Sequence, residues 1–83
     1  MPILDIKNQF LDLSKLEINT DAKILKIINC EITNIELLAA KFPRVSYLTI
    51  HSNNVIIMNL DYILSYDLNY VNFNKNVLLL LKD

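Results

Sequence analysis

The sequence contains no glycine and no tryptophan, and it has a single cysteine among its 83 residues. Without glycine there is no glycine-rich loop that could cradle a phosphate group. Cys30 has no second cysteine to pair with, which excludes an internal disulfide and a cysteine-rich zinc site. A lone cysteine suits a reducing compartment, so we expect an intracellular protein, cytoplasmic or nuclear.

Long apolar runs and an excess of one charge are also missing. The longest apolar run, Val77 to Leu81, is far shorter than the roughly 18 residues that a membrane-spanning helix requires. The first residues, Met1 to Asp5, lack a basic segment followed by an apolar stretch, so we expect no secretion signal and no membrane association. A net charge of −1 gives no bulk attraction to nucleic acids.

The chain is long enough for one small domain, which we place at residues 1–83. A chain of this size buries a smaller share of its surface than a large protein does, and its core leaves only a few kcal/mol of net stability. Small domains therefore often depend on disulfides, a metal or a partner. Because the first two supports are missing here, we expect a partner.

Aliphatic residues recur along the chain at an interval of 23 residues. Leu25, Leu48 and Val71 form the clearest column. Four more columns share the interval: Ile27, Ile50 and Phe73; Cys30, Asn53 and Asn76; Ile32, Val55 and Leu78; Ile35, Met58 and Leu81. A weaker copy, Leu4-x-Ile6-x-x-Gln9-x-Leu11, lies 21 residues upstream. Such regular spacing is typical of a protein built from stacked repeats.

The repeated unit resembles the leucine-rich-repeat pattern L-x-L-x-x-N/C-x-L over about residues 22–81. The resemblance implies an α/β fold, a short leucine-rich-repeat solenoid with parallel β-strands on the concave face and helices or helical turns on the convex face. We expect an atypical first repeat or cap at 1–21, full repeats at 22–44 and 45–67, and a truncated last repeat at 68–83. A small α/β sandwich is the alternative, and the exact register argues against it.

Each strand should be followed by a turn and a helical return. We expect the side chains of Cys30, Asn53 and Asn76 to lie under the turns, where the two asparagines would be buried and hydrogen-bonded. Residues 33–42 read as a helix with a capping box from Thr33 to Glu36, ended by Pro43. Residues 59–66 predict a shorter helix or helical turn with an asparagine cap, and Leu13 and Leu16 predict a weaker return.

If the strands stack in register, alternate side chains point outward in columns. Tyrosine provides a large contact area with a polar tip, so these columns are the candidate partner-binding surface. The alternative to partner binding is that these residues form ordinary cross-strand pairs on a solvated face. The candidate residues are Tyr47, Tyr70, Lys26, Thr49, Asn72, His51 and Asn74, with Ile24 and Ile28 in the same columns and Ile3, Asp5 and Lys7 on the possible first strand.

The sequence gives no indication of catalysis. His51 is the only histidine and has no second ligand or carboxylate at motif spacing. Cys30 occupies a repeat position at a turn, where a buried cysteine is inert. We therefore expect no enzyme activity, no cofactor, no metal and no small-molecule substrate.

Two functions remain. The first is a non-catalytic protein-interaction scaffold, stable mainly within a larger assembly because the apolar end, Val77 to Leu81, has no following repeat to cover it. The alternative is a structural protein of a ribonucleoprotein particle, such as a lineage-specific ribosomal protein. Its RNA contacts would come from lysines that the fold could bring to one face: Lys7, Lys23, Lys26 and Lys75.

Overall fold

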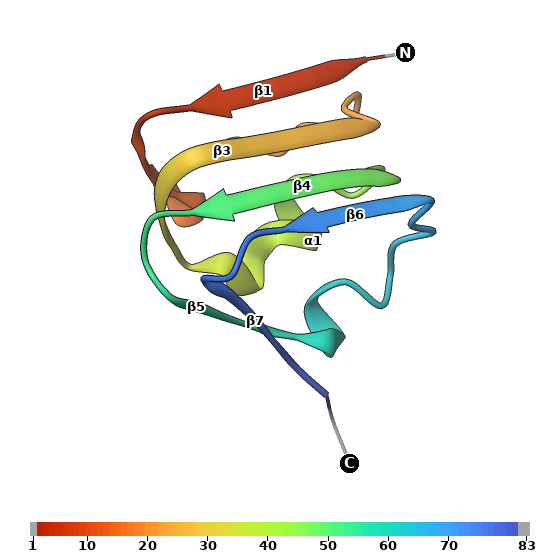
Figure 1. Cartoon of the computed structure of the whole chain (residues 1–83). Helices are drawn as coiled ribbons and strands as arrows, with labels where there is room; N and C mark the ends of the chain where they lie inside the picture. The colour runs from red at the N-terminus through yellow and green to blue at the C-terminus, as the bar shows by residue number, and fades with distance from the viewer. Residues whose placement is uncertain (1, 82–83) are drawn as a thin grey trace.

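Four parallel strands form the main sheet of the computed structural model, which describes residues 2–81. Their order across the sheet is β1 (Ile3–Lys7), β3 (Ile24–Thr33), β4 (Tyr47–Ser52) and β6 (Tyr70–Phe73). Figure 1 shows the four strands stacked side by side with the chain returning behind them after each one. The chain is thus an α/β fold with mostly parallel strands and few helices.

The predicted register of the columns is confirmed where the main sheet forms. Leu25 pairs with Leu48, and Leu48 pairs with Val71, so the 23-residue interval links neighbouring strands. The weaker upstream copy takes part as well, because Leu4 pairs with Leu25 at its own interval of 21 residues. Leu25 and Leu48 are fully buried, as expected for side chains that point to one face of a strand.

Three further strands lie beyond the ends of the main strands. β2 (Phe10–Asp12) pairs in parallel with the last part of β3. β5 (Ile56–Asn59) and β7 (Val77–Leu80) form a separate parallel pair. These strands and the helical turns enclose an apolar core with the main sheet, and the most completely buried large side chains are Phe42, Leu13, Leu25, Ile27, Ile32, Leu38, Leu48, Ile50 and Met58.

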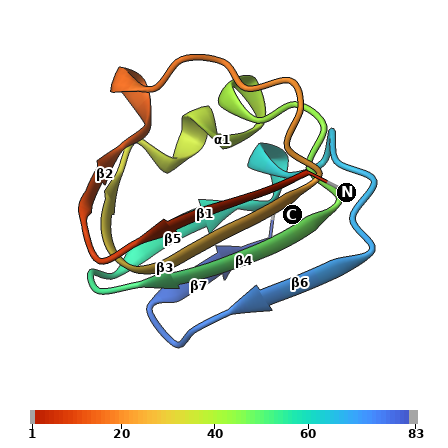
Figure 2. The same cartoon turned by 90° about the horizontal axis from the view of Figure 1, so that it is seen from above.

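The helical returns are shorter than predicted. They consist of 3-10 turns η1 (Leu13–Lys15), η2 (Ile35–Leu37) and η3 (Leu60–Tyr62), with the single α-helical turn α1 (Leu38–Lys41) directly after η2. Figure 2 shows them across the interior from the main sheet. The returns expected near Leu13 and in residues 59–66 are confirmed as helical turns, and the Asn59 side chain accepts a hydrogen bond from the Asp61 amide at 3.0 Å.

The helical segment predicted for residues 33–42 is present but shorter, and its predicted capping box from Thr33 to Glu36 is wrong. Thr33 belongs to β3, because it pairs with Asp12 at the end of β2. Asn34 then takes a left-handed conformation with φ 60°, and its side chain makes no cap hydrogen bond. Strand pairing therefore extends past the position at which the sequence pattern begins the helix, and only residues 35–41 remain helical.

The prediction that Asn53 lies buried under a turn is also wrong. Asn29 adopts a left-handed conformation with φ 56° and adds one residue to β3, so Cys30 aligns with Ser52 and not with Asn53. The register between β3 and β4 is shifted by one residue, so Ser52 is buried beside Cys30 and Asn53 is exposed. The buried polar position at this corner is thus one residue earlier than the repeat predicts.

Asn54 takes the structural role that the repeat assigned to Asn53. Its side-chain oxygen accepts from the Ile32 amide at 2.8 Å, and its side-chain nitrogen donates to the Ile32 carbonyl at 2.9 Å. The Asn54 side chain thus supplies the two hydrogen bonds that a neighbouring strand would otherwise make to Ile32. Because β5 diverges from β3 here, this amide satisfies backbone groups that would be costly to leave unpaired.

The last corner follows the prediction more closely. Asn76 is half-buried and its side-chain nitrogen donates to the Ser52 carbonyl at 2.9 Å. Beyond the corners the column of Ile32, Val55 and Leu78 loses its inward direction, because Val55 is 64% exposed and Leu78 is 49% exposed, whereas Ile35 and Met58 of the next column are buried. β5 and β7 pair Ile56 with Val77, so the 23-residue interval does not set the register of these two strands.

Candidate binding face

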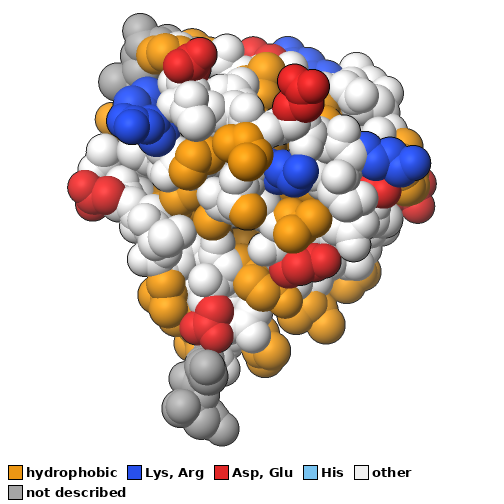
Figure 3. All heavy atoms as spheres, turned by 180° about the vertical axis from the view of Figure 1, so that it is seen from behind, with side chains coloured by type: hydrophobic (Ala, Val, Ile, Leu, Met, Phe, Trp, Pro, Cys, Tyr) orange, Lys and Arg blue, Asp and Glu red, His pale blue; other side chains and the backbone are white. Residues whose placement is uncertain are grey.

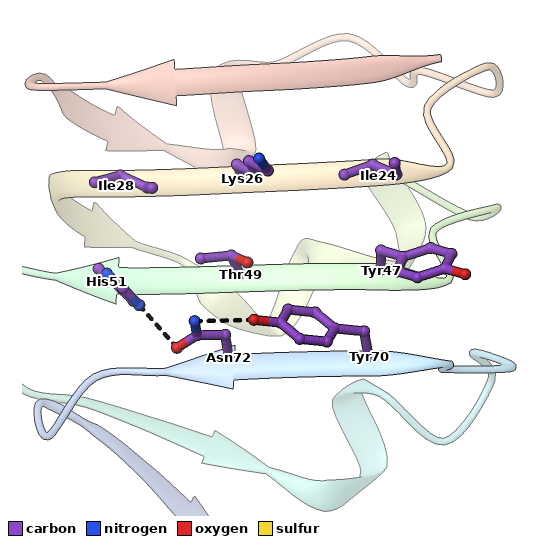
Figure 4. A pocket seen from close by; sticks show the side chains of 8 residues that line it. All are labelled: Ile24, Lys26, Ile28, Tyr47, Thr49, His51, Tyr70 and Asn72. Carbon is purple, nitrogen blue, oxygen red and sulfur yellow. Dashed lines mark hydrogen bonds between the residues drawn. The ribbon is translucent and has the colours of Figure 1, made fainter. Parts of the chain in front are cut away.

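Side chains from three adjacent strands line a hollow of about 410 Å³ on the outer face of the main sheet. Their alternation along each strand directs them away from the core. Figure 4 shows them in three rows across β3, β4 and β6. We call this set the sheet-face hollow, and its residues are Ile24, Lys26, Ile28, Tyr47, Thr49, His51, Tyr70 and Asn72.

Six of the seven residues predicted for partner binding lie together in the sheet-face hollow: Lys26, Tyr47, Thr49, His51, Tyr70 and Asn72. Asn74, the seventh, lies elsewhere. β6 ends at Phe73, and the Asn74 side chain turns to the corner, where it accepts from the Ser52 amide at 3.1 Å and donates to the Ser52 carbonyl at 2.8 Å. Asn74 is therefore a corner residue, because the last strand is shorter than its neighbours.

Two apolar residues of the hollow were not among the predicted binding residues. Ile24 and Ile28 lie on β3 on either side of Lys26 and line the hollow with it. Their period-two spacing about Lys26 already indicated this orientation, since i and i+2 positions of a strand share a face. The hollow is consequently more apolar than the predicted residues alone suggest.

The two tyrosines of the hollow are stacked. The ring centroids of Tyr47 and Tyr70 are 6.4 Å apart with an angle of 28° between the ring planes. The pairing follows from the register, which places Tyr47 directly beside Tyr70 on the neighbouring strand. Tyr70 is 49% exposed, so the stacked pair presents aromatic surface to solvent.

Asn72 connects the polar groups of the hollow. Its side-chain nitrogen donates to the Tyr70 hydroxyl at 3.1 Å, and its oxygen lies 3.0 Å from His51 Nε2. Because an amide oxygen can only accept, Nε2 is the protonated nitrogen of His51 in this arrangement. Figure 4 shows the resulting row of His51, Asn72 and Tyr70 along the boundary between β4 and β6. These contacts fix the orientation of three side chains before any partner arrives.

Lys26 is the only permanently charged residue that lines the hollow. Asp5 lies beside it on β1 in register, but Asp5 does not line the hollow. Within residues 2–81, the Lys26 ammonium has no carboxylate at ion-pair distance. The hollow therefore combines apolar walls with one exposed positive charge.

The lysines proposed for RNA contact do not meet on one face. Lys26 lies in the sheet-face hollow, and Lys7 lies on the neighbouring strand β1, in register with Ile28. Lys23 lines a different hollow with Pro43 and Arg44, beside the starts of the strands. Lys75 follows β6 at the opposite end of the sheet. Only two of the four therefore share a surface.

Other kinds of site are not apparent in the part of the chain that the structure describes. Within residues 2–81, no three histidine, cysteine, aspartate or glutamate side chains are grouped as metal ligands would be. None of the helices there has the length and apolar character needed to cross a membrane.

Comparison with protein-family models, with curated proteins and with solved structures found no match to this chain.

Proposed function

We propose that the chain is a short leucine-rich-repeat solenoid that acts as a non-catalytic protein-interaction scaffold and binds its partner on the concave face of β1, β3, β4 and β6. The observation that carries the proposal is the sheet-face hollow, where two stacked tyrosines, two isoleucines and a few polar groups converge. Aromatic side chains with polar tips are the residues that dominate binding energy in protein interfaces. The repeat register supports the solenoid part of the proposal.

Preorganisation supports protein binding at this face. The Asn72 network and the tyrosine stack already hold His51 and Tyr70, so this face loses less side-chain entropy when a partner binds.

We also propose that the chain works within a larger assembly in the cell, and its exposed apolar surface supports this. In and after β7, Leu78, Leu80 and Leu81 are about half exposed or more. Figure 3 shows apolar side chains on the lower part of the back of the molecule. Contiguous apolar patches of this kind are typical of contact surfaces.

The ribonucleoprotein alternative has less support. RNA binding depends on lysines and arginines that follow a phosphate backbone. The four candidate lysines are spread over different surfaces, and the chain has a net charge of −1. We therefore propose protein binding, and the experiment below also tests for RNA binding.

The test is affinity capture from an extract of the source cells with the wild-type chain and with the Tyr47→Ala, Tyr70→Ala double variant. We expect the double variant to lose its partner, with binding at least tenfold weaker, because truncating aromatic interface residues commonly costs 2 kcal/mol or more. The matched control is Leu64→Ala, which removes a 64% exposed side chain outside the hollow. Unchanged capture by the double variant would show that the binding surface lies elsewhere.

Two further arms separate protein from RNA. Capture is repeated after RNase treatment and over a range of salt concentrations. A protein interface with an apolar centre should persist under both, whereas an RNA contact should be lost with RNase and weaken steeply with salt.

A further inference from the structure

We propose that the occupant of the sheet-face hollow is an extended peptide segment in which apolar side chains are interleaved with carboxylates. This inference rests on the proposed protein-binding function and names the chemistry of the partner. It follows from the charge of the hollow, its unused hydrogen-bonding groups and its apolar walls.

The charge in the hollow is of one sign. Lys26 lies at the centre of the β3 row, and none of the eight lining residues is aspartate or glutamate. The Lys26 ammonium has no ion-pair partner within the described residues 2–81. A carboxylate on the partner would therefore meet an ammonium that forms no ion pair with the described residues.

Several hydrogen-bond donors there are also unused. The Asn72 oxygen, the main acceptor, already faces His51 Nε2. The Tyr70 oxygen accepts from Asn72, so its own O–H remains for donation. The second N–H of Asn72, the Tyr47 hydroxyl and the Lys26 ammonium are further donors, since an amide nitrogen carries two hydrogens and an ammonium three. These unused donors suit a partner that provides acceptors, and a carboxylate offers acceptors only.

The walls of the hollow require more than an anion. Ile24 and Ile28 lie on either side of Lys26 along β3, so a bound carboxylate has apolar surface next to it in both strand directions. In an extended peptide, residues i and i+2 share a face, which matches the spacing of Ile24, Lys26 and Ile28. A peptide that places a carboxylate between two apolar side chains on one face fits this row. An RNA strand offers the negative charge but no aliphatic groups for the two isoleucines.

Asp5 provides an internal test of the electrostatic argument. It lies on β1 directly beside Lys26 and outside the lining of the hollow. Its carboxylate reduces the positive potential at Lys26 without touching the ligand. Removing this charge should tighten the binding of an acidic peptide, and a gain of affinity is not produced by a misfolded variant.

The experiment begins with a random peptide library displayed on phage and selected on the full-length chain, in parallel with a Lys26→Glu variant. The wild-type chain should enrich peptides in which Asp or Glu lies two positions after one apolar residue and two positions before another. The Lys26→Glu variant should shift the selection to Lys or Arg at the same positions. Circular dichroism of both proteins confirms that they are folded.

The most enriched wild-type peptide, labelled with fluorescein, then serves as the probe in fluorescence polarisation. We expect Lys26→Met to weaken binding about tenfold, because a charge-assisted hydrogen bond is lost while the aliphatic stem is kept. Asp5→Asn should tighten binding about twofold to threefold, as expected for a solvent-screened charge. Lys15→Met, which removes an exposed charge on η1, should change nothing.

The outcomes separate this inference from the function on which it rests. If the selected peptides lose binding to Tyr47→Ala, Tyr70→Ala but carry no excess of acidic residues, the carboxylate inference is wrong and the protein-binding face stands. If their binding ignores the tyrosine substitutions, or if no peptide is enriched, both are wrong. Displacement of the probe by a single-stranded oligouridylate at equal concentration would also overturn the peptide assignment.

Discussion

The two edges of the main sheet differ in charge. The β1 edge has charged residues within its strand, whereas neither β6 nor the following strand β7 contains a charged residue. Pro2 precedes β1, and Asp5 and Lys7 lie within it. β6 (Tyr70–Phe73) and β7 (Val77–Leu80) contain no charged residue, and Lys75 lies in the turn between the two strands.

Proteins commonly protect exposed strand edges with proline and charge, because unpaired backbone groups invite pairing with another chain. The β1 edge carries such protection and the β6 edge does not. Val71 and Leu78 on the unprotected side are 43% and 49% exposed. The comparison indicates that one edge is adapted to solvent and that the other is suited to contact.

The largest expected effect compares the centre of the sheet with its unprotected edge. Leu48→Ala should lower the free energy of unfolding by about 2 to 5 kcal/mol, because Leu48 is fully buried on the central strand β4. Val71→Ala, at the next position of the same column, should cost about 1 kcal/mol or less, since Val71 is 43% exposed. Urea denaturation measures both, and equal losses would mean that the β6 edge is covered in solution.

The next effect compares the two sides of β3 at its C-terminal end, where β2 lies on one side and Asn54 on the other. β2 pairs with β3 through the backbone, whereas β5 diverges and Asn54 bonds both backbone groups of Ile32. Asn54→Ala should therefore cost about 1 to 3 kcal/mol. Asn53→Ala is the matched control, because the neighbouring side chain is exposed, and it should change stability little. Denaturation curves that rank the two variants in the opposite order would restore the original repeat assignment.

A smaller effect tests the edges directly by exchanging their chemistry. Leu78→Lys places a charge on the exposed side of β7 and should reduce association of the chain at high concentration severalfold. Lys7→Leu removes a charge from the β1 edge and should increase association. Analytical ultracentrifugation over a range of concentrations measures both. Equal responses at the two edges would remove the distinction between them.

The smallest effect distinguishes the caps of two helical turns. Asp12 accepts hydrogen bonds from the Ser14 amide, the Ser14 hydroxyl and Asn34, and these bonds hold the pKa of the Asp12 carboxyl below its ordinary value. The ionised form is thus favoured in the folded state, so its contribution is present above the unfolded pKa and is lost as pH falls through the folded one.

The equivalent cap at η3 is Asn59, which does not titrate. Acidification through the folded pKa of Asp12 should therefore weaken the cap of η1, whereas the Asn59 cap itself does not titrate. NMR titration of the Asp12 carboxyl and the Ser14 amide, with the Asn59 side-chain amide as the reference, measures this. A parallel response of both amides would show that the two turns do not differ in this way.

The binding face could be predicted from the sequence more fully than the corners could. Six of seven predicted residues lie in the hollow because strands with a constant interval place their alternate side chains in rows. Asn74 was misplaced because the sequence does not mark Phe73 as the end of β6. The capping box predicted at Thr33 failed for a related reason. Thr33 pairs with Asp12 on β2, and the local sequence around Thr33 does not indicate this long-range pairing.

The sequence by itself determined the rows of the main sheet, because period-two alternation and the 23-residue interval are properties of the chain that any parallel stack must keep. Only the tertiary structure decided what happens at the corners. One left-handed residue, Asn29, shifts the register by one position and moves the structural role from Asn53 to its neighbours. Such a shift depends on how adjacent strands meet in space, and a repeat read along one chain does not contain that information.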